Sequence, residues 1–226
     1  MRIVFSGLER PIDIEPGLPT VLQVENSSLF TRLCLSLRSG EEREAIEPYV
    51  IWRGEKEIAT RDALMFIGDP MLLPWDDRAL MGSISKRFEK ELIEDEELRR
   101  TLEDAAVALS SQVASLGLSM YGDYSFAIEW DLKRFIKAFG FGAHPNPQET
   151  FLDNLIDFLS FVLDIQCSKV MVFVNLKTFL TEIELEKLYE HVFFSKTRVL
   201  LLENKADPNR HENEIKTTID LDFIEK

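Results

Sequence analysis

A polar turn between an apolar strand and a helix is the first place where this chain could bind a phosphate. Residues 21–36 read VLQVENSSLFTRLCLS, so the turn falls near Asn26 and Ser27. A phosphate-binding P-loop requires GxxxxGK[ST], because its glycines let backbone N–H groups surround the phosphates and its lysine neutralises their charge. VENSSLFTRL contains neither glycine nor lysine. The sequence therefore predicts the layout of a nucleotide hydrolase without its phosphate-binding chemistry.

The carboxylate that would hold magnesium in such an enzyme is also missing where we expect it. The apolar strand KVMVFVN ends in Asn175, and an amide binds a hard cation more weakly than a carboxylate does. GxSxG does not occur, and neither cysteine has an activating base nearby in the sequence. We expect no nucleotide cofactor and no enzymatic activity, with catalytic groups from distant positions as the open alternative.

Charge and composition narrow the classes of function. The 226 residues are 45% hydrophobic, enough for a core, and carry a formal net charge of −14. No run approaches the roughly 20 apolar residues of a membrane span, so we expect a cytoplasmic protein. The negative charge argues against indiscriminate DNA binding, because DNA repels an anion at long range. Cys34 and Cys167 are expected in the core, and the three histidines lack the spacing of metal ligands.

The hydrophobic pattern predicts an α/β protein with a helical insertion. We expect an α/β domain from residues 1–75 and 142–226, and a helical insertion over 76–141. An apolar strand, a helix with a Thr181–Glu184 capping box, and a second apolar strand form a βαβ unit. The expected strands are 2–6, 11–15, 17–25, 49–52, 63–68, 169–175 and 198–204, with one late strand in the polar tail 206–226. The expected helices run from 26 or 27 to about 39, and over 78–118, 130–141, 149–166 and 181–194.

Residues 78–118 have the apolar spacing of a long amphipathic helix or of a helical pair. The acidic run EDEE at 94–97 lies on a solvated face or marks a break between two helices. An apolar stripe of this length favours an interface between subunits. An intramolecular hairpin is the alternative.

A resemblance to a known family rests on five strings in succession. They are MRIVFSGLERPIDIEPG, TVLQVENSSLFTRL, FIKAFGF, KVMVFVNLKTFLTEIELEKLYEHV and RVLLLEN, which together span nearly the whole chain. The most distinctive part is FVN followed by LTxxEL and by a strand ending in LEN. In this succession the chain resembles the DNA-end-binding spacer-acquisition family of type II-A CRISPR systems.

The resemblance implies a homotetrameric ring whose subunits have a P-loop-ATPase-like α/β head without Walker motifs and an inserted helical leg. It implies binding of linear double-stranded DNA ends during CRISPR adaptation, a step of antiviral defence, without enzymatic activity. The implied partners are the two-protein integrase and the RNA-guided effector nuclease. The alternatives are a nucleotide-dependent enzyme on a degenerate P-loop fold and a purely structural scaffold for the adaptation complex.

A ring would reconcile DNA binding with the negative charge, because only its inner lining must be basic. Three basic clusters are candidates for this lining, with contacts to phosphates and no reading of bases. For each residue the alternative is a solvated surface charge. The clusters are Arg53, Lys56 and Arg61; Lys86, Arg87 and Lys90; and Lys133, Arg134 and Lys137.

The resemblance also implies calcium, bound near the hinge between head and leg. The corresponding stretch of this chain retains Asp123, Glu129 and Asp131. Calcium takes about six to eight oxygen ligands, so such a site would depend on carbonyls, water or a neighbouring subunit. In the alternative interpretation Asp123 lies in a Gly-Asp turn and Asp131 caps the following helix.

Overall fold

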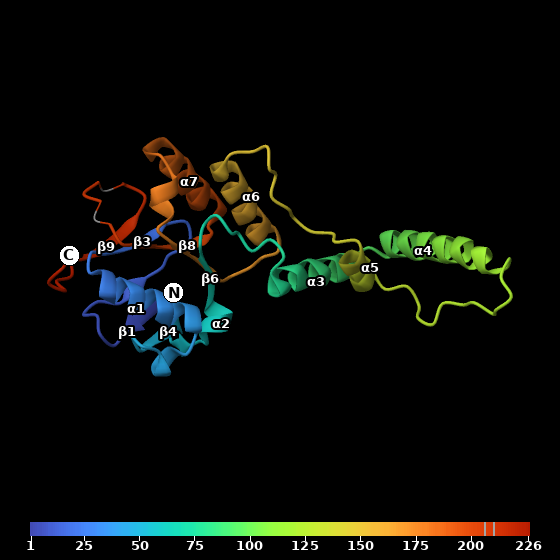
Figure 1. Cartoon of the computed structure of the whole chain (residues 1–226), viewed down its shortest axis with the longest axis horizontal. Helices are drawn as coiled ribbons and strands as arrows, with labels where there is room; N and C mark the ends of the chain where they lie inside the picture. Colours follow the sequence, from blue (N-terminus) through green and yellow to red (C-terminus); the bar gives the residue numbers. More distant parts are fainter. Residues whose placement is uncertain (206, 210) are drawn as a thin grey trace. The chain divides into compact units, whose positions relative to one another are not determined.

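Strand pairing organises the chain into two sheets, which both lie in one of its two units. The computed structural model describes residues 1–205, 207–209 and 211–226 (Figure 1). Unit 1 consists of Met1–Pro74 with Pro145–Lys226, and unit 2 of Trp75–His144. Helices accompany a parallel sheet, so the expected α/β class is confirmed.

A parallel sheet of five strands forms the centre of unit 1, in the order β6-β7-β8-β3-β9. Figure 1 shows α6 and α7 on one side of it and α1 on the other. Because both faces are covered, uniformly apolar strands are stable there, and the strand–helix–strand unit β7–α7–β8 is confirmed. The strands are β3 (Thr20–Val24), β6 (Leu64–Gly68), β7 (Val170–Val174), β8 (Arg198–Glu203) and β9 (Ile215–Ile219). The helices are α1 (Ser27–Ser39), α6 (Phe151–Asp164) and α7 (Glu182–Ser195).

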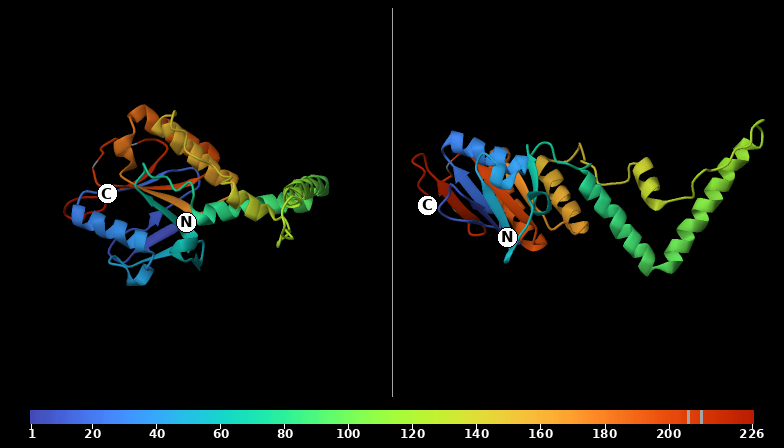
Figure 2. Two further views of the ribbon diagram at one scale, coloured as in Figure 1. Left: turned by 45° about the vertical axis from the view of Figure 1, so that its right-hand side comes forward. Right: turned by 90° about the horizontal axis from the view of Figure 1, so that it is seen from below.

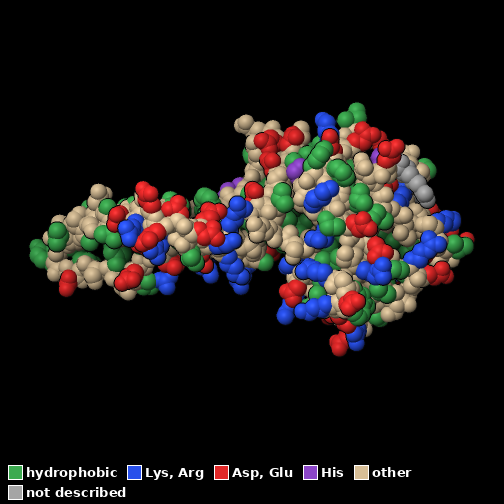
Figure 3. Space-filling view, turned by 180° about the vertical axis from the view of Figure 1, so that it is seen from behind, with side chains coloured by type: hydrophobic (Ala, Val, Ile, Leu, Met, Phe, Trp, Pro, Cys, Tyr) green, Lys and Arg blue, Asp and Glu red, His purple; other side chains and the backbone are tan. Residues whose placement is uncertain are grey.

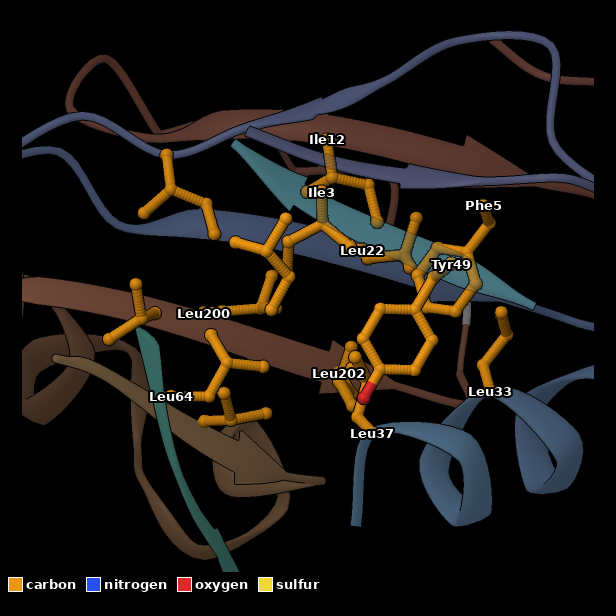
Figure 4. Packing of buried hydrophobic residues seen from close by; sticks show 14 of the residues in the cluster. Ile3, Phe5, Ile12, Leu22, Leu33, Leu37, Tyr49, Leu64, Leu200 and Leu202 are labelled. Carbon is orange, nitrogen blue, oxygen red and sulfur yellow. The ribbon is translucent and has the colours of Figure 1, made fainter. Parts of the chain in front are cut away.

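A smaller antiparallel sheet, in the order β2-β1-β4-β5, packs against the α1 side. The expected hairpin is confirmed, since Ile3 of β1 pairs with Ile12 of β2. Figure 4 shows Tyr49 and Phe5 of this sheet beside Leu37 of α1 in one buried cluster. The strands are β1 (Arg2–Phe5), β2 (Ile12–Asp13), β4 (Tyr49–Arg53) and β5 (Lys56–Glu57). Short helical turns are η1 (Glu42–Glu44), α2 (Thr60–Ala63) and η2 (Leu176–Phe179).

Local signals in the sequence account for the ends of the helices. Asn26 is the N-cap of α1, and its side-chain oxygen accepts hydrogen bonds from the N–H groups of Ser28 at 3.1 Å and Leu29 at 3.0 Å. Gly40 ends the same helix with φ of +69°, a conformation that costs glycine little. The Thr181–Glu184 capping box of α7 is present as predicted.

Three expectations about the environment of residues are wrong in part. Helix α6 does not lie wholly within the core, because Asp153, Asp157 and Asp164 keep one side of it in solvent. The tail is not simply polar and exposed, since the predicted late strand, β9, pairs in parallel with β3 and forms one edge of the sheet. Cys167 lies after the end of α6 and is half-buried, as is Cys34 on α1.

Unit 2 contains three helices, and its acidic run marks a break. Asp95 ends α3 and caps α4, where its carboxylate accepts a hydrogen bond from Leu98 N at 2.8 Å. Helix α3 contacts both α4 and α5. The bounds are α3 (Arg78–Glu94), α4 (Glu96–Gly117) and α5 (Leu132–Ala138). Among the described residues no helix is both long enough and apolar enough to cross a membrane.

Replacing Asn26 with alanine should lower the free energy of unfolding by about 1 kcal/mol, because two N–H groups of α1 lose their acceptor. Urea denaturation monitored by circular dichroism would measure the loss. Asn26→Asp is the matched control, since its carboxylate can accept the same bonds. Equal midpoints for the two variants would contradict the assigned cap.

Candidate functional site

The carboxyl ends of β3 and β8 mark the place where a nucleotide would bind in a fold of this kind. Ligands of open α/β sheets bind outside the carboxyl ends of strands, where successive connections leave for opposite faces of the sheet. Gln23 of β3 pairs with Glu203 of β8 at this edge. The chain leaves β3 into α1 on one face of the sheet, and it leaves β7, the other neighbour of β8, towards α7 on the opposite face (Figure 1). We therefore compared the groups at this edge with the needs of a bound phosphate.

The N-terminus of α1 is already satisfied by its own chain. A phosphate at a helix N-terminus is held by the free N–H groups of the first turn. In α1 the side chain of Asn26 accepts two of these groups, from Ser28 and Leu29. Glu25 N, just before the cap, donates to Ile219 O at 2.9 Å and so ties this turn to β9. The turn thus lacks the glycines of a P-loop and also uses the donors that a phosphate would need.

An acidic strand end does exist, at a residue that the sequence analysis missed. The metal of a nucleotide site must lie near the phosphates, so its carboxylate belongs on the strand beside β3. That strand is β8, which ends in Glu203, and not β7, which is followed by Asn175. The glutamate is visible in RVLLLEN, but its place beside β3 depends on the order of strands in the sheet.

Glu203 makes internal hydrogen bonds. Its side chain is buried, with the residue 3% exposed, and accepts a hydrogen bond from Lys177 N at 3.0 Å. Burial raises the pKa of Glu203 to about 7, although the N–H and the ammonium group of Lys177 act in the opposite direction. Asn175, with φ of +54°, accepts a hydrogen bond from Asn204 N at 3.0 Å. Both side chains therefore join the end of β8 to the segment after β7.

The three basic candidates in unit 1 are exposed and lie near the smaller sheet. Arg53 and Lys56 are paired positions of β4 and β5, so the structure brings these two together. Arg61 lies on α2, with its side chain 88% exposed and 3.8 Å from the carboxylate of Asp62. An ion pair so exposed contributes little stability.

The six basic candidates in unit 2 differ in their acidic partners. On α3, Arg87 pairs with Glu91 at 3.3 Å and Lys90 with Glu94 at 3.7 Å. On α5 the basic side chains are exposed, and no ion pair found in the described part of the chain involves them. These side chains are Lys133, Arg134 and Lys137.

Helices α3 and α5 are in contact, so unit 2 holds two basic clusters on neighbouring helices. The space-filling view shows Lys and Arg side chains gathered over one part of this unit (Figure 3). Lys86 of α3 is exposed like the basic residues of α5. The cluster with the least internal neutralisation is therefore the one on α5.

The calcium candidates are exposed and do not form a cluster of ligands. Asp131 is the N-cap of α5, and its carboxylate accepts a hydrogen bond from Arg134 N at 2.8 Å, as the alternative interpretation expected. Asp123 and Glu129 lie in the segment between α4 and α5. Over residues 1–205, 207–209 and 211–226, no group of three acidic, histidine or cysteine side chains could hold a metal ion. These residues of one chain do not fit calcium by themselves, and the calcium site stays a prediction.

Comparison with known proteins identifies the family. A family model described as CRISPR-associated protein (Cas_Csn2) matches residues 44–223. This chain belongs to the Csn2 family. A CRISPR-associated protein Csn2 of Enterococcus faecalis is 22% identical over 224 residues, covering 94% of each chain. The resemblance inferred from the sequence is thus confirmed.

A solved structure has the same architecture as this chain. The crystal structure of Stu0660 of Streptococcus thermophilus superposes with a TM-score of 0.61 at 12% identity, over 97% of this chain and 74% of that chain. At that identity the likeness shows a shared fold. The matched residues 44–223 include all of unit 2. The match to the family model therefore extends through the whole of the helical unit.

Replacing Glu203 with glutamine should flatten the pH dependence of stability. Because the folded-state pKa is raised, from 4.5 to about 7, folding binds a proton, and the stability from this group is lost as pH rises between these values. The shift corresponds to at most about 3 kcal/mol across that window. Urea unfolding at several pH values from 4.5 to 8 would measure it.

Glu44→Gln, at an exposed position, is the control for this measurement and should leave the pH profile of the wild type unchanged. A Glu203→Gln variant whose stability falls with pH as steeply as the wild type would contradict a raised pKa at this residue.

Proposed function

We propose that this Csn2-family protein forms a homotetrameric ring that binds the ends of linear double-stranded DNA in CRISPR adaptation, without enzymatic activity. The observation that carries the proposal is the exposed basic cluster of α5, which lacks acidic partners among the described residues. A cation that is not neutralised within its own chain can release counterions from DNA when it meets a phosphate. Membership of a CRISPR-associated family supports the same conclusion.

Unit 1 would serve as the head of each subunit, on the plan of a P-loop ATPase without Walker motifs, and unit 2 as the leg. The support is the position of α1 after β3, at the carboxyl edge beside β8. The self-capped turn at Asn26 argues against the alternative of a nucleotide-dependent enzyme, because a phosphate would have to displace the cap.

Exposed apolar side chains on α4 support assembly into a ring. Leu109 is 54% exposed, Val113 45% and Leu116 68%, and their spacing places them on one side of the helix. Figure 2 shows α3 and α4 diverging from their break, so a hairpin contact between them does not cover this stripe. Large exposed apolar surfaces on soluble proteins mark interaction sites, and a second subunit is the partner that the ring requires.

The proposed protein partners are the integrase pair and the RNA-guided effector nuclease of the same system. Calcium belongs to the proposal only as a site completed by carbonyls, water or a neighbouring subunit, since Asp131 already caps α5. A scaffold that only holds these partners together is the second candidate. It differs from the ring because it does not require a DNA end.

Reversing two charges on α5 should weaken binding to DNA ends. We expect Lys133→Glu with Lys137→Glu to lower the affinity for a linear duplex by about 10- to 100-fold. The slope of log affinity against log salt concentration should become shallower by the amount expected for about two lost phosphate contacts. The matched control is Arg99→Glu with Arg100→Glu on α4, which changes the net charge equally but removes residues already near Glu96. Fluorescence anisotropy across a salt series would measure both variants.

A closed circular duplex of the same length separates a ring from a scaffold, because threading onto DNA requires an end. Linear and circular DNA retained equally by the wild type would exclude the ring. Equal loss in the two double variants would show that α5 has no special place in DNA binding.

The mass of the protein in solution tests the assembly directly. We expect a tetramer by light scattering, stabilised by calcium and shifted towards smaller species by a chelator if ligands come from two subunits. Leu109→Asp with Leu116→Asp should dissociate it, because both positions are exposed and apolar on α4. A wild type that is strictly monomeric at every concentration tested would contradict the proposal.

A further inference from the structure

Unit 1 has a groove on its surface that contains none of the basic candidates for DNA binding. A hollow of about 780 Å³ lies between α7 and residues 211–213. Apolar side chains on α7 contribute to it and are exposed, with Ile183 at 67%, Phe193 at 40% and Phe194 at 73%. We call this surface the α7 groove.

The second wall of the α7 groove is anchored by contacts with α7 itself. The Tyr189 hydroxyl donates a hydrogen bond to Glu214 at 2.7 Å. The ring of His211 meets the ring of Tyr189 edge to face, with centroids 5.4 Å apart and an angle of 83°. His211 also lies 3.3 Å from the carboxylate of Glu182, measured between Nε2 and Oε1. The residues that form the groove are therefore joined across it.

A buried ion-pair network holds this wall in place. The side chain of Glu214 is 1% exposed and lies 3.0 Å from Lys177 Nζ, while Lys216 is 3.7 Å from the same carboxylate group. Removing one member of such a network leaves a buried charge without a partner, which is strongly destabilising. The wall is thus fixed before any partner arrives, and a preformed groove avoids the entropic cost of ordering on binding.

Charge selects the kind of partner. Three glutamates line the groove: Glu186, Glu190 and Glu212. The basic residues among the described lining residues are Lys187 and His211. DNA and anionic lipid surfaces would be repelled by this excess of acid. A second copy of the same face would place acids against acids across a two-fold axis.

We propose that the α7 groove binds an apolar segment of another protein that is flanked by lysine or arginine residues. Ile183 and Phe194 are eleven residues apart on one helix, about 16 Å at 1.5 Å per residue. This length fits about three turns of an amphipathic helix, a common mode of recognition in grooves. The proposal does not rest on DNA binding, since none of the basic candidates lies in this groove.

The test uses a synthetic helical peptide of about 14 residues, with leucines on one face and lysines on the other, titrated into the full-length protein by calorimetry. We expect Phe194→Ser to lower its affinity by about 10-fold or more, because truncating a large aromatic anchor of an interface commonly costs that much. Ile46→Ser, another exposed apolar residue of unit 1 at 61%, is the control and should have no effect.

Charge is tested in the same assay. Glu186→Lys with Glu190→Lys should abolish binding, whereas Glu41→Lys with Glu44→Lys, an equal change at exposed positions outside the groove, should leave most of it. A peptide with glutamate in place of lysine should not bind. Equal affinities for the Phe194→Ser variant and the wild type, or equal losses for the two charge-reversal pairs, would overturn the proposal.

Binding of linear DNA, measured in parallel, keeps this result separate from the proposed ring. The groove variants should bind DNA ends as the wild type does, because their substitutions lie outside the basic clusters. Loss of DNA binding in Phe194→Ser would show that the surface does not act independently, and would overturn the proposal. A wild type that binds the peptide but no DNA would contradict the ring and leave the groove supported.

Discussion

Parallel pairing of β3 with β8 and β9 is the constraint on which the rest of the structure depends. It joins residues 20–24 to strands 198–203 and 215–219, across nearly the whole length of the chain. Because both ends of the chain build one sheet, everything between β6 and α6 can leave as a separate helical unit without breaking the core. The same pairing places Asn26, Glu203 and Ile219 at one edge, where a related fold would bind a ligand.

At this edge the protein uses its own side chains where a nucleotide enzyme would use a ligand. Asn26 accepts hydrogen bonds from backbone N–H groups in the first turn of α1. Glu203 does the same for an N–H group at the start of η2, and Asn175 for the N–H group that follows β8. Buried donors must find acceptors, and each of these bonds removes a donor that a phosphate could have used. The donors at this edge are therefore used within the chain itself.

The two proposed binding surfaces differ in which charges are left without a partner of opposite sign among the described residues. Basic residues paired within their own helix, such as Arg87 and Lys90, are partly neutralised before any partner arrives. Within the described part of the chain no ion pair involves those on α5, and for this reason the proposed DNA contacts are assigned to them. On α7 the excess has the opposite sign, with Glu186 and Glu190 beside exposed phenylalanines. One chain of strongly negative charge can therefore present two surfaces with different preferences.

The sequence by itself determined the local elements. Capping residues and periodic apolar positions specify the ends and faces of helices through contacts within a few residues, as at Asn26 and Thr181. The order of the five sequence motifs along the chain was also enough to identify the family. The neighbours of each strand were decided only by tertiary structure, because pairing over nearly two hundred residues has no local signal. That is why Glu203 was overlooked in favour of Asn175, and why burial of Glu214 in the polar tail was not foreseen.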